Sequence, residues 1–331
     1  MKRIISVLTA IILMSFGLCS CTSNEAGNVS NNNSDSESNK KAESYTLYLG
    51  VHQDHDATEG KAKFASTFAA IICDEKGRIV DCVFDETENT VSLEGGAADT
   101  ETDMRSKNEQ GLEYSMKSAS AIGKEWYEQA NHFAQFLLGK TLEEADDVDG
   151  GEAELMAGCT ININGFKDAI DEADDQENSV SFESSTSPRV DLAVVNNSDD
   201  SKNATAESDG VASLKSTYAA VAKADGKIVA ANIEETETKV YFDHSGLIIE
   251  LEKGEGKRDA GYSYAMKGAS EIGLEWFEQV QNFEKYIVGL TPDEVAAIDM
   301  NGAYSADDAL LAGCTIRISD FVKAVAKTAE K

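Results

Sequence analysis

The sequence has few cysteines, few histidines and few basic residues. The shortage of cysteines excludes a disulfide-framed domain, and the shortage of basic residues excludes a nucleic-acid-binding protein. Six cysteines occur in 331 residues, and two of them lie within the first 21, so the chain lacks the disulfide framework of a small secreted domain. Against 29 basic residues stand 60 acidic ones, which gives a net charge of −31. So negative a surface repels nucleic acid and anionic lipid headgroups, and we expect no nucleic-acid partner.

Two of the remaining cysteines flank a predicted hairpin turn. Cys73 and Cys82 lie on either side of residues 74–77. Pairing Cys73 with Arg78 across that turn would place Cys82 opposite Ala69, so we predict that the two cysteines do not face each other and form no disulfide.

The chain also lacks an apolar run long enough for a comfortable membrane span. Lys2 and Arg3 precede an apolar stretch over residues 4–18, which is the layout of a secretory signal. The following Leu-Cys-Ser-Cys resembles the bacterial lipobox, in which Cys21 fits the lipidated position better than Cys19. We therefore expect residues 1–21 to be a lipoprotein signal and acylated Cys21 to anchor the protein to the outer face of the cell membrane. An ordinary cleaved signal without lipid is the alternative.

Residues 22–44 contain almost nothing that could build a core. We expect them to form a disordered tether that spans about 25 Å, at about 5–6 Å times the square root of its length.

An internal duplication dominates the rest of the chain. Ser66-Thr67-Phe68-Ala69-Ala70 returns as Ser216-Thr217-Tyr218-Ala219-Ala220, and the segment Tyr114 to Gln129 returns as Tyr264 to Gln279. The segment Ala157 to Ile161 returns as Ala312 to Ile316. The offset is 149 or 150 through most of the match and 155 at its end, which indicates an extra loop near residues 300–307. Because a repeat of this length is a whole domain, we predict repeats over 45–173 and 190–331, joined by a linker over 174–189.

Each repeat shows the pattern of an α+β domain. A hairpin is predicted over 64–84 and over 214–233, followed by a charged loop and a helix of about twenty residues. In the first repeat that helix would bury Ala119, Ile122, Trp126, Ala130, Phe133 and Leu137 on one face. Gly139 and Gly289 would end the long helices, and Thr141 and Thr291 would cap short ones. A short strand from Thr160 or Thr315, and a closing helix capped by Asn164 or Ser319, complete each repeat.

The candidate site is the sequence Ala-Gly-Cys-Thr, which occurs once in each repeat. Gly158-Cys159-Thr160 and Gly313-Cys314-Thr315 place a hydroxyl beside small residues. The glycine would allow a large flat ligand or a modifying enzyme to approach the backbone closely. The alternative is a tight turn in which threonine has only a structural role.

These motifs together resemble the FMN-binding lipoproteins of Gram-positive extracellular electron transfer (PplA-like). The resemblance covers both repeats and implies that a flavin transferase, using FAD, esterifies FMN through its phosphate to Thr160 and Thr315. It implies that Gly158, Cys159, Gly313 and Cys314 belong to the two flavin sites. It also implies electron transfer from a membrane quinol-linked dehydrogenase to extracellular acceptors.

The motif departs from the family pattern at several positions. The family has Asp-x-x-Ser/Thr-Gly-Ala-Thr. Here the first hydroxyl residue is Ala157 or Ala312 and the alanine is cysteine. The acid six residues before the threonine is Glu154 in the first repeat, whereas the second repeat has Ala309 there, with acids slightly upstream.

Other notable residues have simpler interpretations. Trp126 and Trp276 are predicted core anchors, and Met116 and Met266 are predicted packing residues. Tyr114 and Tyr264 could be surface or core. Cys159 and Cys314 are expected to fill buried space rather than to act in redox chemistry. His52 and His55 hint at a metal, but the pair is absent from the second repeat, and we expect no metal site. No Ser/His/Asp or Cys/His constellation occurs in both repeats.

The leading hypothesis is therefore a membrane-anchored extracellular flavoprotein, an electron carrier rather than a substrate-specific enzyme. The alternative is a non-redox surface lipoprotein that binds a small ligand or a protein partner. A flavin-dependent reductase of one soluble acceptor is a third hypothesis, which is disfavoured because no further substrate domain is evident.

Overall fold

The computed structural model describes residues 41–100, 103–174 and 178–330. The predicted signal, Cys21 with its predicted lipidation, and most of the predicted tether lie outside the described residues. No helix within the described ranges is long and apolar enough to cross a membrane.

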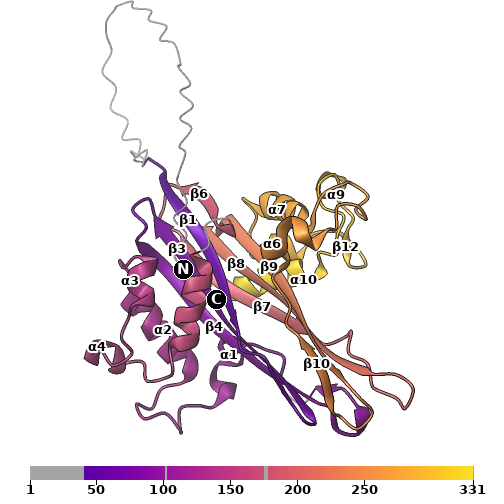
Figure 1. The fold of residues 1–331 in the computed structure, drawn as a ribbon. Helices are drawn as coiled ribbons and strands as arrows, with labels where there is room; N and C mark the ends of the chain where they lie inside the picture. The colour runs from indigo at the N-terminus through magenta and orange to yellow at the C-terminus, as the bar shows by residue number, and fades with distance from the viewer. Residues whose placement is uncertain (1–40, 101–102, 175–177, 331) are drawn as a thin grey trace, which may run out of the picture. The chain divides into compact units, whose positions relative to one another are not determined.

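Two antiparallel sheets form the centre of the molecule (Figure 1). The first has the order β5-β4-β3-β1-β6, with β2 paired to β3. Its strands are β1 (Glu43–Gln53), β2 (Asp56–Thr58), β3 (Lys61–Asp74), β4 (Ile79–Ser92), β5 (Asp99–Thr100) and β6 (Val180–Ser184). The second has the order β10-β9-β8-β7. Its strands are β7 (Arg189–Asn197), β8 (Gly210–Ala224), β9 (Lys227–Phe242) and β10 (Ile248–Glu252).

The helices follow in the same order in the two halves of the chain. The first half has α1 (Lys107–Gln110), α2 (Trp126–Leu137), α3 (Leu142–Asp146), α4 (Ala153–Met156) and α5 (Asn164–Ala173). The second half has α6 (Lys257–Ala260), α7 (Trp276–Ile287), α8 (Pro292–Ala296), α9 (Asp308–Leu311) and α10 (Ser319–Lys327). The extra loop of the second repeat is the small hairpin of β11 (Met300–Asn301) and β12 (Tyr304–Ser305). The fold is thus α+β, as predicted.

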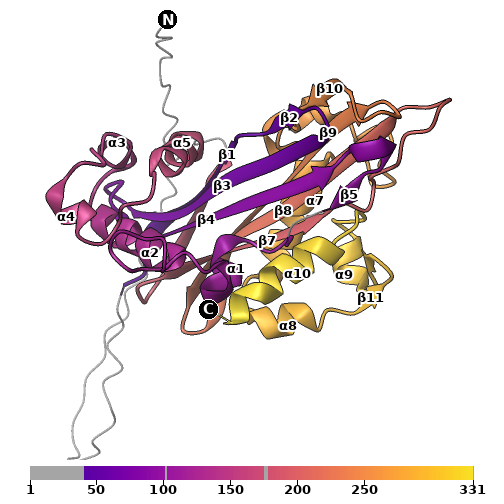
Figure 2. The same cartoon turned by 90° about the horizontal axis from the view of Figure 1, so that it is seen from below.

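The two sheets pack face to face, and the helices cover their outer faces (Figure 2). Alternate residues of each strand point to opposite sides, so one strand supplies both the inter-sheet core and the helix-facing core. Phe68 and Tyr218, which are equivalent in the two repeats, meet between the sheets with ring centroids 5.0 Å apart. Contact between equivalent positions is typical of a two-fold relation, here between the repeats of one chain.

The predicted hairpins are confirmed and extend further than predicted. In the first turn, Asp74 Oδ1 accepts hydrogen bonds from the Lys76 and Arg78 backbone N–H groups at 2.8 and 2.9 Å. A bulge between Ile72 and Cys73 shifts the register, so Cys82 lies opposite Ile71 rather than Ala69. All four cysteines that the structure describes are free and buried.

The prediction of a twenty-residue helix was wrong. The helix α2 begins only at Trp126, and Ala119 lies exposed in a turn. A capping box causes this start, because the Glu125 side chain accepts from the backbone at Glu128 while the Glu128 side chain accepts from the Glu125 backbone. The buried face from Trp126 onward is as predicted, as are the caps of α3 and α8 by Thr141 and Thr291.

The strands predicted to begin at Thr160 and Thr315 are not formed. Both threonines lie in loops between a short helix and a closing helix. Asn164 and Ser319 are the first residues of those closing helices rather than their caps. In the first repeat Asn162 Oδ1 accepts from the Asn164 backbone N–H at 3.0 Å and takes the capping role.

The predicted linker 174–189 contains a strand. This strand, β6, pairs antiparallel with β1. The sequence pattern did not reveal β6. The connection between the repeats is therefore part of the first sheet.

Candidate functional site

A buried glutamine holds the motif threonine in each repeat. In the first repeat, Thr160 donates to Gln129 Oε1 from its backbone N at 2.8 Å and from its hydroxyl at 3.1 Å. In the second, Thr315 donates to Gln279 Oε1 at 2.8 and 3.2 Å. Both glutamines are completely buried. The glutamine side chain accepts the hydrogen bond from the threonine N–H that a carbonyl of a neighbouring strand would otherwise accept. The loop backbone is therefore satisfied without β pairing.

Each glutamine is itself held in one orientation. Gln129 Nε2 donates to Ser120 Oγ at 3.2 Å and to the Lys124 carbonyl at 3.2 Å. Gln279 Nε2 donates in the same way to Ser270 Oγ at 3.1 Å and the Leu274 carbonyl at 3.3 Å. The amide oxygen is therefore fixed toward the threonine. A hydroxyl that donates its proton to this oxygen turns its lone pairs outward, where an electrophile could approach.

The motif glycines have a different role from the one expected. A Cβ on Gly158 would lie 2.3 Å from His132 Cγ, and a Cβ on Gly313 would lie 2.9 Å from Asn282 Nδ2. Both glycines therefore let the loop pack against α2 or α7, rather than leaving space for a ligand.

The motif cysteines are buried, as predicted. Burial raises the pKa of the Cys159 thiol, and it raises the pKa of Cys314 to about 11. A thiol with so high a pKa is a poor nucleophile at neutral pH. The cysteines fill space beneath the loop.

In the second repeat the threonine lines a cavity of about 700 Å³. Ligand pockets typically measure about 300–1,000 Å³, so a cofactor-sized molecule is within range. The wall combines aromatic and thioether side chains with cationic ones, namely Trp276, Tyr264, Met266, Lys215, Lys257 and Arg317. The inserted hairpin adds Asn301, Tyr304 and Ser305 to the lining.

A cluster of four residues, here named the lysine box, occurs in both repeats, and in the second repeat it lines the same cavity as Thr315. In the second repeat, Lys257 Nζ pairs with Glu235 and lies 5.3 Å from the Tyr264 ring centroid and 5.7 Å from that of Trp276. In the first repeat the equivalent residues are Lys107, Glu86, Tyr114 and Trp126. There, Lys107 Nζ lies 2.5 Å from Glu86 Oε1 and 5.1 and 5.6 Å from the two ring centroids. The geometry is nearly the same in both repeats.

The start of a short helix positions each lysine. In the first repeat, Asp85 Oδ1 accepts from the Glu86 and Asn108 backbone N–H groups at 2.8 and 3.0 Å, which fixes strand β4 against α1. In the second, the Glu234 carboxylate accepts from the Glu235 and Arg258 N–H groups. Burial alone would lower the pKa of each lysine, but the charge and hydrogen bond of its glutamate outweigh burial and raise the pKa above its usual value. Both lysines are therefore charged at neutral pH.

Sequence reasoning did not identify the box lysines and glutamates, because scattered charges usually indicate a solvated surface. The signal was available in the duplication: Lys107 and Lys257 are 150 residues apart, and Glu86 and Glu235 are 149 apart. The tryptophans were predicted as core anchors, and they do pack on the core, through Phe166 and Phe321. Trp276 also faces the cavity.

The acids near the motif have structural roles. Asp307 caps α9 by accepting from the Ala309 and Leu310 N–H groups, and it accepts from the Tyr286 hydroxyl at 2.9 Å. These hydrogen bonds hold the pKa of Asp307 below its usual value. Glu154 lies in α4, where its backbone carbonyl is 3.2 Å from His132 Nε2.

The histidines predicted not to bind metal lie apart from the site. His52 lies 3.7 Å from Asp168, and His55 Nε2 lies 2.7 Å from Gln53 Oε1. Among the described residues, no group of three or more histidines, cysteines or acids is arranged to hold a metal ion.

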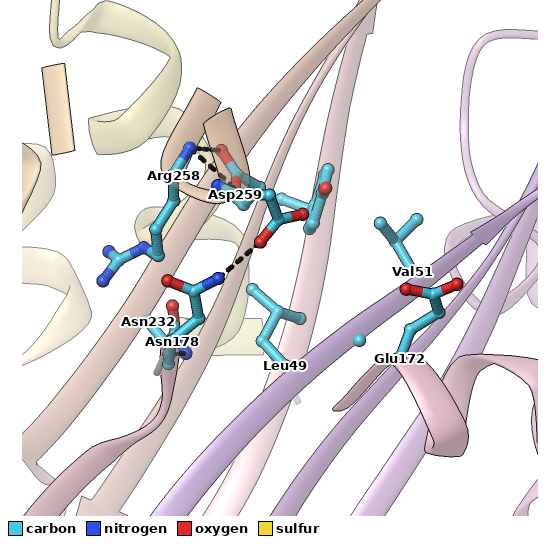
Figure 3. Close-up of a pocket in the computed structure, with 10 residues that line it drawn as sticks. Leu49, Val51, Glu172, Asn178, Asn232, Arg258 and Asp259 are labelled. Carbon is cyan, nitrogen blue, oxygen red and sulfur yellow. Dashed lines mark hydrogen bonds between the residues drawn. The ribbon is translucent and has the colours of Figure 1, made fainter. Parts of the chain in front are cut away.

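A second, smaller cavity of about 60 Å³ lies between the repeats (Figure 3). Leu49 and Val51 of β1 line it with Tyr218, Glu234 and Arg258 of the second repeat. Burial raises the pKa of Glu234 to about 8, and the charge of Arg258 opposes that shift only in part. This cavity does not include either motif threonine.

Glu234 gives a pH prediction. Its pKa is raised from 4.5 to about 8 in the folded protein, so between these values the folded state holds a proton that the unfolded state has lost. The free energy of unfolding should then fall as pH rises through that window, by at most about 1.4 kcal/mol per pH unit from this group. We expect urea unfolding from pH 4.5 to 8 to show a smaller fall for Glu234→Gln than for wild type. If the free energy of unfolding falls equally with pH in the two proteins, the raised pKa of Glu234 is contradicted.

Comparison with known proteins gives one partial relative. A chlorophenol reductase from Desulfitobacterium hafniense is 33% identical over 95 residues, which cover 24% of this chain and 29% of the reductase. The chain thus spans less than a third of the length of the relative it matches. No family model and no solved structure matches.

Proposed function

We propose that this protein is a membrane-anchored extracellular electron carrier with FMN esterified through its phosphate to Thr160 and Thr315. The observations that support the proposal best are the threonine hydroxyl held by a buried glutamine and the lysine box, both of which occur in each repeat. In the second repeat, the threonine and the box line one cavity of sufficient size. The partial relative is named a reductase, which agrees with a redox role.

The residues present fit the cofactor. The aromatic faces of Trp276 and Tyr264 suit a flat ring, and the basic side chains of the cavity suit a phosphate group in a chain that is otherwise strongly acidic. Bound flavin would supply the redox chemistry, and the protein would supply position and environment. A covalent bond also suits an extracellular protein, because a ligand with nanomolar affinity, about −12 kcal/mol, is lost by dilution.

The attachment step balances without any oxidant. The threonine oxygen bonds to the FMN phosphorus of FAD while the bond from that phosphorus to the bridging oxygen breaks. AMP leaves with the electron pair, and the threonine proton goes to solvent. In the described part of the chain, the hydrogen-bond partner of each hydroxyl is a neutral amide, so a separate flavin transferase would supply the catalysis.

The experiment that tests the proposal is production of the full chain with and without a flavin transferase. With the enzyme, we expect yellow protein whose flavin fluorescence survives denaturing electrophoresis, and two FMN additions by mass spectrometry. Peptides that contain Thr160 and Thr315 should contain the modification. Unmodified, colourless protein in the presence of active transferase would remove the proposal and favour a non-redox surface protein that binds a ligand in the same cavity.

A further inference from the structure

We infer that the lysine of each box binds the electron-rich edge of the flavin ring and raises that ring's reduction potential. The inference rests on the proposed function and adds to it a residue that tunes the cofactor. It follows from the contents of the cavity, because the proposed ligand would be attached at Thr315 and all four box residues of the second repeat line the same cavity.

The box is built to present a cation beside a flat ligand. Lys257 Nζ lies between the aromatic faces of Tyr264 and Trp276 and lines the cavity. Its side chain is 18% exposed, so water screens it little. Of its three N–H donors, Glu235 takes one and the Tyr264 hydroxyl another, which leaves one for an acceptor in the cavity.

The repeats have diverged around the box but not in it. Phe68 corresponds to Tyr218, Lys124 to Leu274 and Asn162 to Arg317. The box itself has the same four residue types in both repeats. A buried ion pair contributes little stability compared with apolar residues of similar size, so stability alone does not require it.

The chemical effect follows from charge. Reduction adds electrons to the flavin ring and increases the negative charge at its N1 and C2-carbonyl edge. A fixed cation in a site of low dielectric constant stabilises that charge more than it stabilises the oxidised ring. The reduction potential therefore rises.

The test uses the full chain with Thr160→Ala, loaded by the transferase at Thr315 alone, and spectroelectrochemical titration of the bound flavin. Lys257→Met should shift the oxidised-to-reduced ratio about tenfold toward oxidised at a fixed potential, which is about 30 mV for a two-electron couple. Lys257→Arg should stay near the parent. Glu235→Gln leaves the lysine and removes the opposing charge, so it should shift the ratio the other way and gives an independent measurement if Lys257→Met folds poorly.

Lys267→Met is the matched control, because Lys267 is exposed and is not among the residues that line the cavity. If Lys257→Met and Glu235→Gln both titrate like the parent and like this control, the inference is overturned, while the covalent flavin and the proposed function stand. If the parent itself takes up no flavin, both are overturned.

Discussion

Replacing Thr160 and Thr315 together by alanine is expected to abolish covalent flavin, and each single replacement is expected to leave one FMN. The hydroxyl oxygen is the atom that would bond to phosphorus, and among the described residues no other hydroxyl donates to the buried Gln129 or Gln279 oxygen. The mass of the intact protein, compared with that of wild type made in the same cells, gives the number of FMN additions directly. Electron delivery to an external oxidant by the native host should fall with the flavin content.

Thr→Ser at the same positions separates loss of the nucleophile from damage to the loop. Serine retains the hydroxyl and its hydrogen bond, so both serine variants should keep the modification. Alanine removes only the hydroxyl bond, worth about 0.5–1.5 kcal/mol, while the backbone bond from residue 160 to Gln129 Oε1 remains. The alanine variants should therefore fold. Two FMN additions in the doubly substituted protein would show that attachment occurs elsewhere.

The parts of the fold that depend on local chemistry could be predicted from the sequence. The hairpins follow from alternation around a turn with Asp74 and Gly77, and the short helices follow from Thr141 and Thr291 as caps. Gly139 has φ +82°, a conformation that favours glycine, and it comes immediately after Leu138, the C-cap of α2. These signals involve residues within a few positions of one another.

The parts that depend on distant partners were predicted less well. The spacing of Ala119 and Ile122 matches a helix, but the Glu125 carboxylate accepts from the Met116 and Lys117 N–H groups at 2.8 and 3.2 Å, which holds that segment as turns. The Thr160 loop is held by Gln129, 31 residues earlier in the chain. Hydrophobic periodicity and helix or strand propensity do not describe such contacts between a side chain and a backbone group elsewhere in the chain.

The candidate site also has a part that could be predicted from the sequence and a part that could not. The threonines were identified from the Ala-Gly-Cys-Thr motif and from the family resemblance, and the structure places Thr315 in a cavity. The lysine box was not identified, because its members come from β9, α6, the turn after α6 and α7, and its charges resemble the acidic and basic surface around it. Only the fold brings a lysine from one element between aromatic rings from two others.

The lysine boxes also differ in what supports their glutamates, and stability should reveal the difference. Lys107→Met is expected to destabilise the protein by about 2 kcal/mol, as for the loss of a charged hydrogen bond, because Glu86, whose side chain is 24% exposed, then loses its ion-pair partner. Lys257→Met should cost roughly 1 kcal/mol, since Glu235 keeps Lys215 Nζ at 3.3 Å and the Thr217 hydroxyl at 3.3 Å. Urea unfolding of the chain made without flavin would measure both.

The position equivalent to Lys215 in the first repeat is Ala65, which supplies a rescue. Ala65→Lys combined with Lys107→Met should recover part of the lost stability, because it places a second cation where the other repeat has one. Conversely, Lys215→Ala combined with Lys257→Met should approach the larger loss of the first repeat. Equal losses for the two single variants, with no recovery on adding the lysine, would mean that the glutamates are stabilised by water rather than by their lysines. The charge of each box would then be screened as well, which would weaken the electrostatic basis for tuning a flavin.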